Sequence, residues 1–139
     1  MSRRIAVRAL GIATLVIGAA YVALGVALVA GGIAGAHDPS DWQPLLALLG
    51  GMMIVIGLPF AGFGLLVVLA GVGLLFRKPW ARWLTFALAI PVACIGYLFA
   101  GGPDPGPGAT TVGTIQLLYA PIAYVVLIVS GPAFARDTP

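Results

Sequence analysis

The residues that could do acid, base or metal chemistry lie outside four long apolar stretches of this chain. The 139-residue sequence carries seven Lys or Arg, four acidic residues and one His, and none of them falls in the hydrocarbon portion of a stretch. Ionisable groups within a membrane are the usual marks of proton relays and ion-coupled transport. The sequence therefore lacks the membrane carboxylate that small multidrug exporters and rotor-ring subunits of ATP synthases need.

One polar turn carries residue types that bind metals. His37, Asp38 and Asp41 lie between the first two apolar stretches. This spacing has little specificity for a metal, and the same turn can simply be solvated while Asp38 caps the following helix. With one Cys, Cys94, and one His, the chain cannot form the cysteine pairs of quinone-linked disulfide enzymes or a bis-histidine haem. We predict no catalytic residue, no metal site and no cofactor.

Polar side chains inside the third and fourth stretches offer a second candidate site. Tyr97, Gln116 and Tyr119 lie in their outer halves, within about 10 Å of the span ends at a rise of about 1.5 Å per residue. They could form an outward-facing cleft for a lipid headgroup, a quinone or a small solute. They could equally be interhelical hydrogen bonds and an interfacial tyrosine belt.

Four membrane helices must position these residues. Hydrophobic residues make up 61% of the chain and charged residues 8%, whereas about a quarter of a soluble domain is charged. Each bilayer crossing takes about 20 residues, so four spans use up the length. We predict an all-α, integral membrane four-helix bundle as a single transmembrane domain over residues 1–139. The expected spans are residues 9–35, 44–76, 80–100 and 111–134.

The charges predict the orientation of the bundle. The basic residues all fall on one side of the spans, whereas three acidic residues occupy the other two connections. Because Lys and Arg near span ends stay cytoplasmic, both termini are predicted to lie on the cytoplasmic side of a bacterial inner (plasma) membrane. Topology explains the net charge of +3, so no nucleic-acid partner is predicted. The two groups are Arg3, Arg4, Arg8, Arg77, Lys78, Arg82 and Arg136, against Asp38, Asp41 and Asp104.

The first and second spans have unusual lengths. The first resembles a secretory signal ending at residues 34–36, but it exceeds the about 7 to 15 apolar residues of a signal core. The second, about 50 Å long as a helix against a core of about 30 Å, must tilt, kink at Pro59 or begin at the interface. Pro91 and Pro121 lie mid-span as well, so the three prolines either line a substrate path or reflect the frequency of proline in membrane helices.

Small residues repeat along the first two spans. Glycines recur in strict steps of seven in each, which favours close, left-handed helix crossings. We predict a tight hairpin packed glycine to glycine, with an alanine seam on the opposite face of the first span that meets another span or a second copy. The glycine columns are Gly11, Gly18, Gly25, Gly32 and Gly50, Gly57, Gly64, Gly71, and the seam is Ala6, Ala9, Ala13, Ala20, Ala23, Ala27, Ala30 and Ala34, broken at Val16.

The inner turn between the second and third spans has a recognisable pattern. Residues 73–83 read GLLFRKPWARW. This run resembles a turn in uncharacterised small bacterial four-span proteins, which show a GLL-x-R-x-x-W-A-R pattern entering the third span. The resemblance implies a hydrophobic four-helix membrane protein and carries no activity. Arg77, Lys78 and Arg82 could contact anionic headgroups between interfacial indoles, or serve topology alone.

These observations favour a non-enzymatic membrane protein that acts through helix packing. It would be an accessory or assembly subunit of a membrane complex, or a self-oligomer, with the bilayer and other membrane subunits or itself as partners. The alternative is a small uncoupled transporter, channel or lipid-handling protein that uses the outer cleft of Tyr97, Gln116 and Tyr119. A membrane enzyme is the remaining class, and it would lack a general base within the bilayer.

Site-directed labelling tests the orientation. Single cysteines replacing Ser40 or Asp104 should react with a membrane-impermeant thiol reagent from outside, because the predicted connections that carry them are external. A cysteine at Asp137 should react only after permeabilisation. External labelling at Asp137 would refute four spans with both ends inside.

Overall fold

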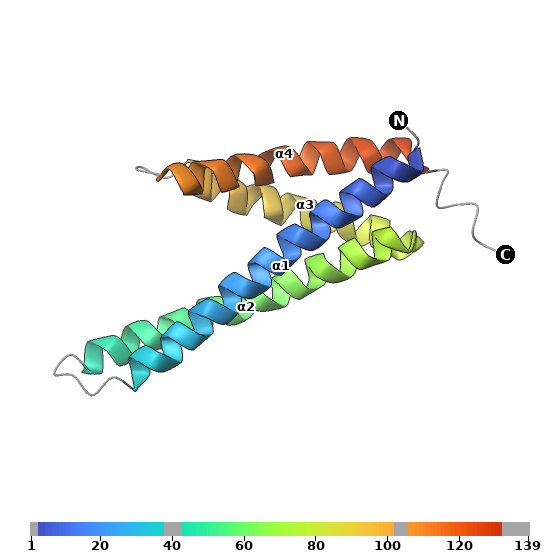
Figure 1. The fold of residues 1–139 in the computed structure, drawn as a ribbon. Helices are drawn as coiled ribbons and strands as arrows, with labels where there is room; N and C mark the ends of the chain where they lie inside the picture. The colour runs from blue at the N-terminus through green and yellow to red at the C-terminus, as the bar shows by residue number, and fades with distance from the viewer. Residues whose placement is uncertain (1–2, 38–42, 102–105, 132–139) are drawn as a thin grey trace. The chain divides into compact units, whose positions relative to one another are not determined.

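Four α-helices make up the regular structure of the described part of the chain. The structure is a computed structural model and describes residues 3–37, 43–101 and 106–131. Its helices are α1 (Arg3–Ala36), α2 (Gln43–Leu75), α3 (Pro79–Ala100) and α4 (Pro107–Val129), as Figure 1 shows. Each contains a segment that is long and apolar enough to cross a membrane. The all-α fold with four candidate membrane helices is therefore confirmed.

Proline starts two of the helices and lies inside three. Pro79 and Pro107 occupy the first turn of α3 and α4, where the missing N–H would have no helical partner anyway. α4 consequently begins four residues before the expected start of its span. Pro59, Pro91 and Pro121 lie inside α2, α3 and α4, and each of these helices continues through its proline.

The chain divides into two compact units. The first unit comprises Met1–Ala13 and Ala70–Pro139, and the second comprises Thr14–Leu69. The first therefore holds the beginning of α1, the end of α2 and all of α3 and α4. The second is the hairpin formed by the rest of α1 and α2.

In the second unit, α1 and α2 run side by side and approach at glycines (Figure 1). A Cβ atom built on Gly18 would lie 2.6 Å from the backbone nitrogen of Val68 and 3.0 Å from the carbonyl oxygen of Gly64. One on Gly32 would lie 2.5 Å from the carbonyl oxygen of Gly50. Real Cβ atoms do not approach backbone so closely, so a larger side chain at these positions would push the helices apart.

The middle of the hairpin repeats the same geometry. A Cβ on Gly25 would collide with the backbone nitrogen of Ala61 and lie 2.7 Å from the carbonyl oxygen of Gly57. Three other helical glycines, Gly31, Gly51 and Gly62, have nothing within 4 Å of such an atom. The helices therefore approach closely only at glycines on the facing sides of α1 and α2, and not at every glycine.

In the first unit, α3 packs along α4. Gly96 and Gly113 lie at their contact, and a Cβ on Gly96 would lie 2.9 Å from the carbonyl oxygen of Gly113. The beginning of α1 meets the end of α2 in this unit too, with a Cβ on Gly11 lying 3.2 Å from the carbonyl oxygen of Gly71. Buried residues of α3 and α4 recur mostly at spacings of three and four, as in a helix–helix seam. They are Ala81, Thr85, Ala89, Val92 and Gly96 on α3, and Gly113, Gln116, Tyr119, Ala120, Ala123 and Leu127 on α4.

Alanine substitutions test the close approaches. Gly25→Ala should destabilise the folded protein by about 1 to 3 kcal/mol, because its methyl group would overlap the backbone of α2. Gly31→Ala, on the same helix with open space around it, should be neutral or stabilise by about 0.5 to 1 kcal/mol through its better helix propensity. The measurement is reversible unfolding in mixed detergent micelles. Equal effects of the two substitutions would contradict the geometry.

Candidate functional site

The three residues of the predicted polar cluster do not share one surface. On α4, Gln116 is 8% exposed and Tyr119 is 7% exposed, so both are buried. On α3, Tyr97 is 66% exposed, and its ring lies near Gly101, where a Cβ would be 3.7 Å from the ring carbon Cζ. The structure therefore puts Gln116 and Tyr119 in the interior and Tyr97 on the outside.

Gln116 is the notable polar residue of this region. Its Cβ packs against α3, 2.7 Å from a Cβ built on Gly96. Its side-chain Oε1 is buried and has no hydrogen-bond partner in the described part of the chain. A buried amide oxygen without a donor is costly and rare, so this atom is the strongest local mark of a missing polar partner.

A cluster between the beginning of α3 and the end of α4 was not predicted from the sequence. The Phe86 and Tyr124 rings lie 5.0 Å apart between centroids, and the Tyr124 hydroxyl donates a hydrogen bond of 3.1 Å to the Phe86 carbonyl oxygen. Such a bond ties a side chain of one helix to the backbone of another. A tyrosine inside an apolar span, Tyr124, was the only sequence feature that pointed to this cluster. Its partner, Phe86, lies on another helix and could not be predicted from residue spacing.

The turn between α2 and α3 has a defined backbone motif. The Lys78 amide donates to the Gly73 carbonyl oxygen at 2.8 Å, and the Arg77 amide donates to the Leu74 carbonyl oxygen at 3.1 Å. These are the two hydrogen bonds of a Schellman motif, in which the residue equivalent to Arg77 takes the left-handed conformation and is usually glycine. Here Arg77 has a φ of 53°. Its side chain therefore costs about 1 to 2 kcal/mol that glycine would avoid.

Arg82 lies one turn into α3 in an aromatic setting. Its guanidinium carbon is 5.9 Å from the centroid of the Trp83 ring and 5.8 Å from that of Phe86. A Cβ on Gly131 would lie 3.1 Å from its terminal nitrogens, so the guanidinium rests against the backbone beyond α4. Its Nε is buried and has no hydrogen-bond partner among the described residues.

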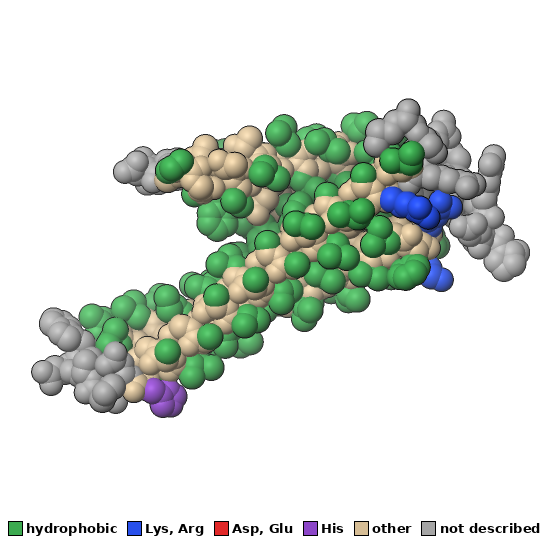
Figure 2. Space-filling model, viewed as in Figure 1, with side chains coloured by type: hydrophobic (Ala, Val, Ile, Leu, Met, Phe, Trp, Pro, Cys, Tyr) green, Lys and Arg blue, Asp and Glu red, His purple; other side chains and the backbone are tan. Residues whose placement is uncertain are grey.

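The visible face of the described residues is largely apolar (Figure 2). Figure 2 shows hydrophobic side chains spread over the visible face, and the visible Lys and Arg side chains of the first unit gathered at the end where α1 begins. No Asp or Glu is among the described residues. The basic groups that the structure describes therefore meet no carboxylate within that part of the chain.

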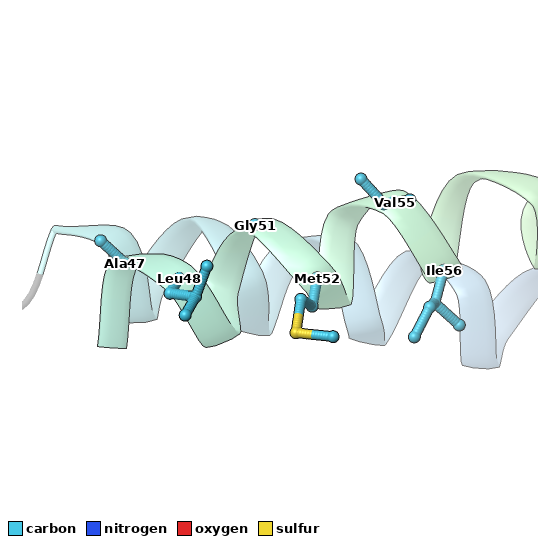
Figure 3. Close-up of a pocket in the computed structure, with 6 residues that line it drawn as sticks. All are labelled: Ala47, Leu48, Gly51, Met52, Val55 and Ile56. Carbon is cyan, nitrogen blue, oxygen red and sulfur yellow. The ribbon is translucent and has the colours of Figure 1, made fainter. Parts of the chain in front are cut away.

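The first half of α2 carries a shallow apolar depression. All its lining residues come from one face of this single helix, as Figure 3 shows. None of them offers a charge or a hydrogen-bonding side chain, so the depression suits an acyl chain or an apolar helix rather than a polar substrate. The residues are Ala47, Leu48, Gly51, Met52, Val55 and Ile56.

The second unit buries the side chain of Tyr21. Tyr21 is 3% exposed, with its ring 5.4 Å from that of Phe63 and 6.1 Å from that of Phe60 between centroids. Its hydroxyl has no hydrogen-bond partner in the described residues. The ring fills the space beside Gly64, where a Cβ would be 2.9 Å from the Cβ of Tyr21.

Of the three residues considered as metal ligands between α1 and α2, the structure describes only His37. Its Nδ1 lies 2.8 Å from the carbonyl oxygen of Ile33, so the ring donates to a free carbonyl in the last turn of α1. Asp38 and Asp41 lie outside the described residues. Cys94 is exposed on α3.

No protein-family model, curated protein or solved structure matches this chain.

Removal of the Tyr124 hydroxyl tests the hydrogen bond between Tyr124 of α4 and Phe86 of α3. Tyr124→Phe should lower the free energy of unfolding by about 0.6 to 1.7 kcal/mol, because a hydrogen bond between membrane helices is lost. Tyr97→Phe removes the same atom from a mostly exposed side chain and should change stability by less than about 0.5 kcal/mol. Thermal melting in detergent compares the two. A larger loss from Tyr97→Phe would contradict the described cluster.

Proposed function

We propose that this chain is a non-enzymatic multi-pass membrane protein that acts through helix packing. It serves as an accessory or assembly subunit of a membrane complex or as a self-oligomer. Both termini face the cytoplasm of a bacterial cell, and the membrane is the inner (plasma) membrane. α1 and α2 form a hairpin held by glycine-to-glycine packing, and the face of α1 opposite the glycines binds the partner.

The exposed alanine seam of α1 carries this proposal. In the second unit the column glycines Gly18, Gly25 and Gly32 of α1 are buried, whereas the alanines of the seam in that unit are exposed: Ala20, Ala23, Ala27, Ala30 and Ala34. Small residues on a membrane helix permit close backbone approach, so such a face favours another helix over lipid. Larger exposed residues lie beside the alanine seam, and their side chains would pack around a neighbouring helix.

The other helix of the hairpin provides the contrast. Opposite its glycines, α2 exposes large side chains such as Met52, Ile56 and Leu66, which are 56%, 50% and 46% exposed. Bulky, flexible side chains of this kind are well solvated by acyl chains and keep backbones apart. We therefore assign the lipid-facing surface to α2 and the partner-facing surface to α1.

Two further observations support the orientation and the hairpin. The described Lys and Arg residues gather at one end of the first unit, as expected for the cytoplasmic side. The glycine positions of α1 and α2 fall opposite one another in register, with Gly18 near Gly64 and Gly32 near Gly50. Because glycines face each other at both ends of the hairpin, glycine packing is the favoured explanation for how the two helices associate.

The transporter or lipid-handling alternative has one observation in its favour. The unpartnered Oε1 of Gln116 could be completed by a polar solute between α3 and α4. Against it, Gln116 and Tyr119 are covered and Tyr97 points to the outside, so the three do not line one opening. The proposed packing function accounts for both the glycine columns and the exposed alanine seam, whereas the alternative accounts for Gln116 alone.

Leucine substitution on the seam tests the proposal. Ala20→Leu with Ala27→Leu should abolish co-purification of the partner subunit, or the oligomer seen after cross-linking in membranes, because both side chains would hold the partner's backbone away. The monomer should remain folded, since both positions are exposed.

Ile33→Phe is the matched control. Ile33 is also exposed, but it lies about 120° around the helix from Ala27 at about 100° per residue and already carries a large side chain. It should leave the assembly intact. Recovery of the unsubstituted protein from membranes as a lone monomer, with no cross-linked product, would overturn the proposal.

A further inference from the structure

We infer that Arg77, Lys78 and Arg82, called here the basic turn, form a binding site for the phosphate of an anionic phospholipid. The inference does not depend on the proposed assembly. It goes beyond the use of these residues for orientation, because orientation requires only their charge near a span end. Two features of the basic turn require more than charge.

The first feature is the strained arginine. Arg77 occupies the left-handed position of the Schellman motif with a φ of 53°, where glycine would be the favoured residue. A costly conformation that persists in a turn indicates that the side chain itself is needed there. The following residue, Lys78, is the N-cap of α3, makes no side-chain capping bond and is exposed. Two adjacent cations thus stand at the turn, beside the positive end of the α3 dipole.

The second feature is the incomplete hydrogen bonding of Arg82. Its Nε is buried without an acceptor among the described residues, and a buried polar nitrogen normally has one. The guanidinium carbon lies 5.9 Å from the Trp83 ring centroid and 5.8 Å from that of Phe86, and the terminal nitrogens lie beside Gly131, which has no side chain to displace them. A phosphate beside this group would supply charge-assisted acceptors in the bidentate geometry that arginine prefers.

The surroundings favour a lipid as the source of that phosphate. Trp80 and Trp83 are 50% and 71% exposed, and Phe76 is 72% exposed, so the basic turn is bordered by side chains that lie at the headgroup level of a bilayer. A polybasic segment at this depth attracts anionic lipid, and hydrogen bonds from Arg82 to the phosphate would make the attraction specific.

Tryptophan quenching by brominated lipids measures the binding directly. In a Trp42→Phe background the remaining indoles, Trp80 and Trp83, report on lipid at the basic turn. The ratio of binding constants for brominated phosphatidylglycerol and brominated phosphatidylcholine should lie well above one. Arg82→Gln should lower this ratio by about fivefold or more, because it removes a basic side chain at the headgroup level as well as its hydrogen bonds.

Two further variants separate a lipid site from a structural or a bulk-charge role. Arg77→Gly should raise the thermal midpoint, since the strain is relieved, and yet lower the lipid ratio. Arg8→Gln removes the same charge from an exposed residue of the first unit outside the turn, and it should leave the ratio nearly unchanged.

Three results would overturn the inference. They are a ratio near one in the unsubstituted protein, an equal fall in Arg8→Gln and Arg82→Gln, and an unchanged ratio in Arg77→Gly. None of these readings involves the alanine seam, so failure here and failure of the assembly proposal are distinguishable. Inorganic phosphate added in excess should not reduce the ratio; competition by it would assign the site to a free anion instead.

Discussion

The proposed packing of this chain depends on one constraint: around helices that span a membrane, lipid replaces water. Burying one apolar side chain against another gains little when the alternative surroundings are equally apolar, so helices in a bilayer associate through close packing and interhelical hydrogen bonds. In the second unit the approach of Gly18 to Val68 and Gly64 leaves no room for a methyl group. In the first unit Gly96 and Gly113 bring α3 and α4 equally close. Large side chains accordingly occupy the outer surfaces, where acyl chains can solvate them.

This constraint also separates the two small-residue faces of α1. Gly25 lies against the backbone of α2, whereas Ala27, two residues on, is exposed. A helix that needed only one neighbour would gain nothing from small residues on its opposite face. The proposed assembly uses the second face in the same way as the hairpin uses the first, through backbone proximity rather than through charge or hydrogen bonds.

The sequence predicted the elements well and the site less well, for physical reasons. Long apolar runs bounded by turns predict membrane helices because the bilayer sets their length, and all four helices were found. Gly96 and Gly113 were missed because a single pair makes no periodic column. Tyr97 was grouped with Gln116 by depth, but it follows the contact residue Gly96 by one position, which turns it about 100° away from α4. The contact of Arg82 with Gly131 depends on how α3 and α4 align, which no local pattern encodes.

The central claim is that glycine packing holds the hairpin of α1 and α2. The most direct test is to measure contacts between the two backbones in a lipid environment. In nanodiscs, nuclear Overhauser contacts should link the α-protons of Gly25 to the amide proton of Ala61, and those of Gly18 to the amide proton of Val68, because only glycine allows these backbones to touch. Gly31 and Gly51 should show no contact between helices. Loss of the Gly25 and Gly18 contacts, with side chains of α1 and α2 meeting elsewhere, would contradict a hairpin held by glycine packing.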